Sequence, residues 1–233
     1  MRVKKAELIR LIKEAIAAEL EEATYPEGFD LQAFKALPNF KSRLEYVKQR
    51  LPKVAQGSAR AVFIVDDTTV LKVAMNKKGL AQNEVEADIG RHSDNYPVAK
   101  VFEVGDQGAW LEMERAVKAK PSDFERIAGI KLKDFQEVVL YWQLERKGKA
   151  AWAGHAPEKY DELVSSGDNN FINSVILLIA DYDMGQGDTT RPSSWGVVNR
   201  NGKPELVLVD FGLTNAVYND YYAPKKSPKP YGY

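Results

Sequence analysis

The stretch Glu205-Leu206-Val207-Leu208-Val209-Asp210-Phe211-Gly212 decides the fold of this chain. Its first five residues are dominated by Val and Leu, which predicts a short buried strand. The strand delivers Asp210, and Gly212 permits a turn two residues later. A carboxylate in this position is well placed to hold Mg²⁺ that bridges the phosphates of a nucleotide. Because such a tripeptide also occurs by chance, this interpretation requires partners elsewhere in the chain.

Lys72 is the first such partner. It lies in the middle of Thr69-Val70-Leu71-Lys72-Val73-Ala74, which reads as a strand, and a charge among apolar residues is disfavoured unless it is paired. Phosphoryl transfer from a nucleotide needs a cation on the phosphates, and Lys72 can supply it. The alternative is a lysine on the exposed face of an edge strand.

Two glutamates are candidates to pair with Lys72. Glu84 and Glu86 both lie in residues 79–89, a segment with the composition of a helix. Residues two apart on a helix face different directions, so only one of them points inward. We favour Glu84, and for either residue the alternative is an ordinary solvated helix charge.

Two further segments complete the set of parts. Gly57-Ser58-Ala59-Arg60 lies between two predicted strands, and small residues there let backbone N–H groups approach phosphate oxygens; an ordinary hairpin turn is the alternative. Asp188 lies 22 residues before Asp210 in a predicted irregular loop, Gln186-Gly187-Asp188. It is the candidate for accepting a hydrogen bond from the acceptor hydroxyl, and a turn-capping Asp is the alternative.

The hydrophobic periodicity predicts an α+β chain in four parts. We expect an N-terminal helical extension over 1–51, a small nucleotide-binding lobe over 52–117, a mostly helical lobe over 118–222 and a flexible tail over 223–233. The small lobe is expected to be a five-stranded sheet with one helix after the third strand. Helices are expected over 5–22, 29–51 (broken near Pro38), 121–129, 131–146 and 160–164, with a buried central helix from Asn169 or Asn170 to about 183.

Composition narrows the function classes. The 233 residues carry 33 basic and 33 acidic side chains, and this balance does not favour a nucleic-acid-binding protein, which usually needs a basic excess. The absence of cysteine excludes disulfides, thiolate catalysis and Cys-ligated zinc, and it fits a reducing cytoplasm. The longest aliphatic run, residues 175–180, is far short of a membrane span. We therefore expect a soluble, cytoplasmic protein without a membrane partner.

Taken together, these motifs resemble the protein-kinase-like superfamily. Residues 54–114 resemble its small lobe, Met113 the residue at the back of the adenine pocket, and Glu114 to Ala116 the hinge that binds the adenine edge. Residues 171–214 resemble its buried helix, catalytic loop and metal strand. The phrases at 56–60, 78–84 and 193–197 further resemble small atypical kinase-like proteins of bacteriophages and bacteria, which implies a host cytoplasm for a phage-encoded protein.

The resemblance implies a two-lobed fold and an ATP-dependent phosphotransferase that uses Mg²⁺. Its acceptor would be an unidentified protein or small-molecule hydroxyl, with nucleotide as the other partner. In this family Gly57, Ser58 and Arg60 would correspond to the phosphate cover. Lys72 would hold phosphates and Asp188 would act in catalysis.

The sequence also departs from the family pattern. Ser193 or Ser194 stands where the family has an asparagine as second metal ligand, and a serine hydroxyl is a poorer ligand. The chain ends 21 residues after Gly212, so the fold is expected to be truncated after the metal-binding strand. These departures motivate two alternatives: a weak or inactive pseudokinase that binds nucleotide or protein, and a purely structural protein.

Overall fold

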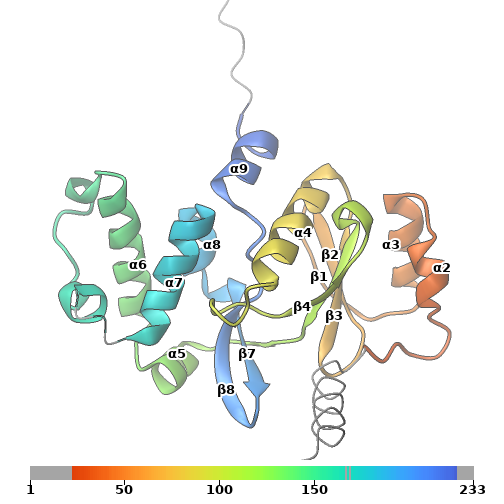
Figure 1. Cartoon of the computed structure of the whole chain (residues 1–233), viewed down its shortest axis with the longest axis horizontal. Coiled ribbons are helices and arrows are strands. Elements are labelled where there is room, and N and C mark those ends of the chain that lie inside the picture. Colours follow the sequence, from red (N-terminus) through yellow and green to blue (C-terminus); the bar gives the residue numbers. More distant parts are fainter. Residues whose placement is uncertain (1–22, 166, 168, 225–233) are drawn as a thin grey trace, which may run out of the picture.

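The computed structural model describes residues 23–165, 167 and 169–224. Within them, an antiparallel sheet with its helices forms one lobe, and a mostly helical lobe follows it in the chain (Figure 1). The predicted α+β, two-lobed architecture is therefore confirmed. The helix predicted over 5–22, and most of the predicted tail, lie outside the described residues.

The sheet of the first lobe has five strands in the order β1-β2-β3-β5-β4, and every neighbouring pair is antiparallel. One helix, α4, follows the third strand, as predicted. The elements are β1 (Lys53–Gln56), β2 (Arg60–Ile64), β3 (Thr69–Ala74), α4 (Lys77–Gly90), β4 (Val101–Val104) and β5 (Trp110–Glu114).

The central strand β3 presents its two faces to different surroundings. Leu71 and Val73 are completely buried in a cluster with apolar side chains of residues 29–51. Lys72 points the other way, because successive side chains of a strand alternate between faces, and it lines the cavity between the lobes. The alternative of an exposed edge strand for Lys72 is therefore wrong.

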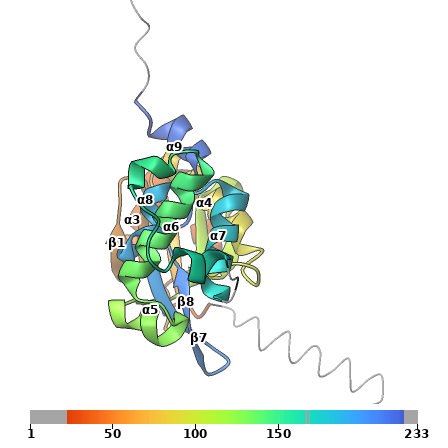
Figure 2. The same ribbon diagram turned by 90° about the vertical axis from the view of Figure 1, so that its left-hand side faces the viewer.

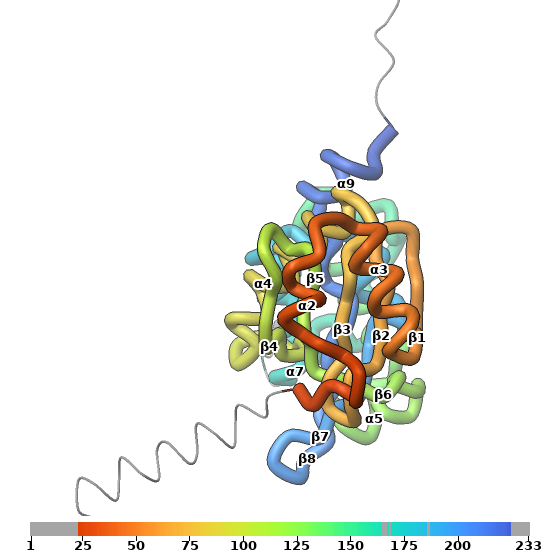
Figure 3. Tube along the Cα trace, turned by 90° about the vertical axis from the view of Figure 1, so that its right-hand side faces the viewer, coloured from red at the N-terminus to blue at the C-terminus, as the bar shows by residue number. Residues whose placement is uncertain are grey.

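Two short helices, α2 (Leu31–Lys35) and α3 (Phe40–Lys48), cover the outer face of the sheet (Figure 3). Side-chain oxygens of Asp30 and Asn39 cap their N-termini by accepting backbone N–H bonds. The Phe34 ring is fully buried, with its centroid 5.7 Å from that of Trp110. These helices are therefore an integral part of the small lobe and brace the sheet from behind.

The second lobe holds most of the remaining helices, which lie in front when the molecule is seen from that side (Figure 2). Its elements are β6 (Val117–Lys118), α5 (Pro121–Ala128), α6 (Leu132–Arg146), a short π-helix (Asp161–Ser165), α7 (Asn170–Tyr182), α8 (Gln186–Thr190), β7 (Trp195–Arg200), β8 (Lys203–Leu208) and α9 (Asn215–Tyr221).

Several predictions for this lobe are corrected by the structure. Helix α7 begins after Asn169, as predicted, but it buries one face only, and Leu177 remains 47% exposed. The predicted loop at 186–188 is instead the start of α8. The strand predicted at 205–209 is β8, and it pairs with β7, which the periodicity did not identify. Helix α9 was likewise not predicted.

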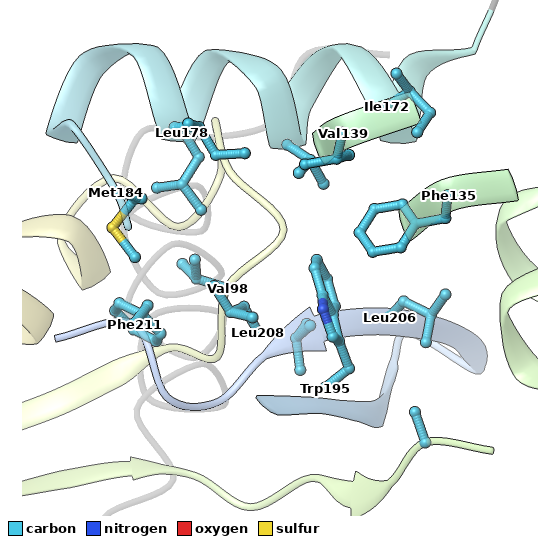
Figure 4. Packing of buried hydrophobic residues seen from close by; sticks show 14 of the residues in the cluster. Val98, Phe135, Val139, Ile172, Leu178, Met184, Trp195, Leu206, Leu208 and Phe211 are labelled. Carbon is cyan, nitrogen blue, oxygen red and sulfur yellow. The ribbon is translucent and has the colours of Figure 1, made fainter. Parts of the chain in front are cut away.

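The core of this lobe is built around Trp195 at the start of β7 (Figure 4). Its ring makes edge contacts with Phe124 and Phe135, and its Nε1 donates to the carbonyl of Thr189 at 2.8 Å. Phe211 is completely buried in the same cluster. The packing therefore fixes both α8 and the segment after β8, the two elements that carry Asp188 and Asp210.

Replacing Phe34 by alanine tests whether α2 and α3 are structural parts of the small lobe. We expect the free energy of unfolding to fall by about 3–5 kcal/mol, because the fully buried ring leaves a cavity. Urea denaturation followed by circular dichroism measures the change. Lys41→Ala, on the exposed side of α3, is the control, and we expect a change within about 0.5 kcal/mol. Equal effects of the two substitutions would contradict this role.

Candidate functional site

A cavity of about 570 Å³ lies between the two lobes. This volume is within the range of ligand pockets, roughly 300–1,000 Å³. Most of the residues predicted for the site line it. They are Gly57, Ser58, Arg60, Lys72, Met113, Glu114, Ala116, Asp188, Ser193 and Asp210.

Three predicted residues do not line the cavity. Glu86 lies directly behind Lys72 and is completely buried. Glu84 is exposed on the other side of α4. Ser194 is buried, and its carbonyl accepts a hydrogen bond from the backbone N–H of Val209 at 2.7 Å. Ser193 is thus the serine that faces the site.

Lys72 pairs with Glu86, so the preference for Glu84 was wrong. The Lys72 Nζ lies 2.7 Å from Oε2 of Glu86, and Lys72 is only 4% exposed. Burial lowers the pKa of Lys72, and the carboxylate of Glu86 opposes that change. Glu86 rather than Glu84 faces Lys72 because Gly79, Asn83 and Glu86 recur at helical spacing on the buried face of α4.

Glu86 also links the two lobes. Its Oε1 accepts the backbone N–H of Phe211 at 3.1 Å, and the Lys72 Nζ donates to the carbonyl of Val209 at 2.6 Å. Gly212 makes the approach possible, because a Cβ there would lie 2.5 Å from the carbonyl oxygen of Gln82. The end of β8 is therefore held against β3 and α4, and Asp210 is fixed at the cavity.

Arg60 is the second cation of this cluster. Its guanidinium lies 2.5 Å from Oδ1 of Asp210 and 2.8 Å from Oε2 of Glu86, and it donates to Oδ1 of Asn83 at 3.2 Å. The Asp210 side chain is 60% exposed, but it faces the concave cavity. Burial acts to raise the pKa of Asp210, whereas the charges of Arg60 and Lys72 outweigh it, so the pKa lies below its usual value.

The segment before Arg60 forms a tight hairpin over the cavity. The backbone N–H of Gly57 donates to the carbonyl of Arg60 at 2.9 Å. Asn76 at the start of α4 donates through Nδ2 to the carbonyl of Ser58, also at 2.9 Å. A Cβ at Gly57 would meet no atom within 4 Å. The hairpin is thus held at Ser58 by the start of α4. Gly57 beside it has open space around its backbone, and it lines the cavity.

Asp188 lies across the cavity from the glycine hairpin, in α8. Burial and the nearby charge of Asp210 raise the pKa of Asp188. Arg191 opposes this change, and its Nη1 lies 3.5 Å from Oδ1 of Asp188. A carboxylate with a raised pKa facing a cleft is typical of a group that handles a proton.

The segment that joins the lobes closes the back of the cavity. Met113 is almost fully buried there, and Glu114 accepts hydrogen bonds from Arg200 at 3.1 and 2.5 Å. Gly196 lies so close to the connection that a Cβ would be 2.5 Å from that of Ala116. Hence the Glu114 side chain fixes β7 to the connection, and residues 114–116 border the cavity.

The side chains at the cavity can hold Mg²⁺ only together with the phosphates of a bound nucleotide. No group of three or more His, Cys, Asp or Glu side chains in the described parts of the chain is arranged to hold a metal ion. Asp210 and Asp188 supply carboxylates and Ser193 a hydroxyl at one cavity. Mg²⁺ commonly binds one or two carboxylates together with substrate phosphates. The residues therefore fit a nucleotide-bound Mg²⁺.

Sequence reasoning missed several residues of the site. Asn83 holds Arg60 and donates to the carbonyl of Gly108, and Arg191 pairs with Asp188. Tyr222, which follows α9, also lines the cavity, and its hydroxyl accepts from Gln82 at 3.1 Å. Asn83 could have been predicted once Glu86 was chosen as the inward glutamate, because residues three apart lie on the same face of a helix.

Comparison with known proteins finds only distant likenesses among solved structures. No protein-family model and no curated protein matches the chain. Among solved structures, the streptomycin–ATP–APH(2'')-IIa ternary complex is 12% identical with a TM-score of 0.31, covering 76% of this chain and 71% of that chain. The GDP and kanamycin complex of APH(2'')-IIia is 14% identical with a TM-score of 0.34, covering 70% and 67%.

A third structure, the ADP-bound aminoglycoside phosphotransferase APH(2'')-Ib, is 12% identical with a TM-score of 0.31, covering 74% of this chain and 70% of that chain. Similarity at this level does not transfer a substrate or an activity, so the site is interpreted from its own geometry.

No helix in the described ranges has the length and apolar character needed to cross a membrane.

Glu86→Gln and Glu84→Gln together test the assignment of the buried partner. Glu86→Gln removes the buried carboxylate that pairs with Lys72 and Arg60. We therefore expect the free energy of unfolding to fall by about 3 kcal/mol or more. The exposed Glu84→Gln should change it by less than about 0.5 kcal/mol. Urea denaturation at pH 7 measures both, and a larger loss for Glu84→Gln would contradict the pairing.

Asp188→Asn should make the protein more stable at pH 7. A group whose pKa is higher in the folded than in the unfolded protein costs stability above the folded pKa, and that cost is lost as the pH falls below the unfolded value. We therefore expect the advantage of Asp188→Asn in thermal melts to shrink between pH 7 and about pH 3.5. An advantage that is absent at pH 7, or that grows on acidification, would contradict the raised pKa.

Proposed function

We propose that the cavity binds ATP with Mg²⁺ and that the protein transfers the γ-phosphoryl group to a hydroxyl of a protein or small molecule. One observation carries the proposal, namely that Lys72, Asp210 and Asp188 meet at one cavity from three separate elements. Phosphoryl transfer needs mainly positioning and charge stabilisation, and this set supplies both.

Each part of the cavity has a role in this proposal. The hinge backbone at 114–116 and the side chain of Met113 hold the base. The hairpin at Gly57 and Ser58 covers the phosphates, and Lys72, kept in place by Glu86, neutralises them. Asp188 accepts the proton of the acceptor hydroxyl, for which its raised pKa is suited.

The metal ligands complete the arrangement. Asp210 is the proposed ligand of Mg²⁺, and Ser193 is a weaker additional one. When bound, Mg²⁺ would neutralise the charge that develops on the transferred phosphoryl group.

A second function, nucleotide binding without transfer, is favoured by two observations. Ser193 offers a hydroxyl where the protein-kinase-like superfamily has an asparagine ligand. In addition, the guanidinium of Arg60 lies 2.5 Å from Asp210, the proposed metal ligand. Both features weaken metal binding. A protein of this kind would act as a pseudokinase, through its occupancy by nucleotide or its contact with a partner.

We further propose that the chain is one of the small kinase-like proteins of bacteriophages and bacteria and that it lies in the cytoplasm. The phrases at 56–60, 78–84 and 193–197 support membership of the small kinase-like proteins of bacteriophages and bacteria. A cytoplasmic location follows from that membership and from the absence of cysteine.

Transfer from labelled ATP separates the enzyme from the pseudokinase. The protein is incubated with Mg²⁺ and labelled ATP, alone and with panels of protein and small-molecule hydroxyl acceptors. We expect Asp188→Asn to reduce transfer by about 10²–10⁴-fold, as for loss of a general base, and Asp210→Ala to abolish it. Asp94→Asn, at an exposed position outside the cavity, should behave as the unaltered protein.

Thermal melts with and without ATP give the second readout. Stabilisation by ATP without transfer would favour the pseudokinase. A protein that shows neither stabilisation nor transfer would refute both nucleotide functions.

A further inference from the structure

Arg60 has an unusual position for a residue of the segment that covers the cavity. A glycine-rich cover acts mainly through backbone N–H groups, but this one ends in a guanidinium that is buried in the site. Arg60 is 8% exposed and contacts both Asp210 and Glu86. Nearby carboxylates raise the pKa of Arg60 despite its burial, so the cation is permanent.

The distinctive partner of Arg60 is Asp210. Glu86 already accepts hydrogen bonds from Lys72 and from the backbone N–H of Phe211. The Lys72 Nζ donates to Glu86 and to the carbonyl of Val209. Arg60 is therefore the cation that directly contacts Asp210, the residue proposed to hold Mg²⁺.

The charges grouped around Asp210 balance without a metal. Three carboxylates form this group, and three cations pair with them. The carboxylates are Glu86, Asp188 and Asp210, and the cations are Arg60, Lys72 and Arg191. A site with two unbalanced carboxylates attracts a divalent cation strongly, whereas the group around Asp210 is already neutral.

Arg60 also has donors left for a ligand. A guanidinium carries five N–H donors, and the three contacts with Asn83, Glu86 and Asp210 engage at most three of them. Arg60 lines the cavity next to the glycine hairpin. Phosphate oxygens are the ligand that a guanidinium fork recognises best.

We infer that Arg60 is a resident cation of the nucleotide site. It balances Asp210 in the metal-free protein and donates to the phosphates of a bound nucleotide, so that a nucleoside diphosphate binds without a divalent metal. This inference rests on the proposed function, because it requires nucleotide in this cavity.

Calorimetric titration of ADP, in EDTA and in excess Mg²⁺, tests the inference on the whole chain. For the unaltered protein we expect the two Kd values to differ by less than about tenfold. For Arg60→Met we expect binding in EDTA to weaken about tenfold or more, as for loss of a charge-assisted hydrogen bond. Mg²⁺ should restore part of that loss, because Asp210 is then free to bind it.

Arg91→Met is the matched control. Arg91 is an exposed cation at the end of α4 that pairs only weakly with Asp88, at 3.8 Å, and its loss should leave both Kd values unchanged. Should Arg60→Met prove unstable in thermal melts, Arg60→Gln, which removes the charge but keeps polar groups, is expected to show the same loss.

Two results would overturn the inference while leaving the proposed function intact. One is equal ADP affinity of Arg60→Met and the unaltered protein in EDTA. The other is an unaltered protein that binds ADP only when Mg²⁺ is present. Failure of the unaltered protein to bind ADP in either buffer would instead refute the proposed function, and the inference with it.

Discussion

The structure depends on the neutralisation of one carboxylate that is completely shielded from water, that of Glu86. A buried carboxylate is costly unless it is paired and hydrogen-bonded. Here Lys72 and Arg60 supply the charges and the Phe211 N–H supplies a further hydrogen bond. Each of these partners comes from a different element, so balancing one charge fixes β2, β3, α4 and the end of β8 relative to one another.

This arrangement explains why the two lobes form one site. Asp210 reaches the cavity because Phe211 is buried in the core of the helical lobe while its N–H is bound by a glutamate of the sheet lobe. The backbone adds a second connection across the lobes, because the N–H of Ala99 donates to the carbonyl of Leu208 and the N–H of Leu208 donates to the carbonyl of Pro97. On the outer face, α2 and α3 cover the sheet, so that Leu71 and Val73 of β3 are packed against them while Lys72 faces the cavity. The cavity is thereby held by elements whose positions are fixed by packing.

Local patterns in the sequence predicted much of this fold. The apolar runs around Lys72 and before Asp210 form strands, and Asn169 caps the helix that follows it. The strand β7 was missed although its signal was present. Asn201 and Gly202 join it to β8 with φ of 54° and 76°, and Asn-Gly is the turn most typical of a hairpin.

The errors at the site have a different origin. Much of the buried face of α4 is polar, because Gln82, Asn83 and Glu86 are buried together with Gly79, Ala87, Ile89 and Gly90. Apolar periodicity therefore does not show which side of this helix faces inward. Polar and small residues at helical spacing mark the face of Glu84, with Ala81 and Asp88, as well as that of Glu86, so the sequence does not decide between the two. The contact of Arg60 with Asp210 joins residues 150 apart, and no local pattern in one sequence specifies such a pair.

A crystal structure of the protein soaked with a non-hydrolysable ATP analogue and Mg²⁺ tests the nucleotide site most directly. We expect the base against Met113 and the hinge, with the phosphates between the hairpin at Gly57, Lys72 and Asp210. Analogue bound elsewhere, or a cavity that stays empty at saturating concentration, would contradict this expectation.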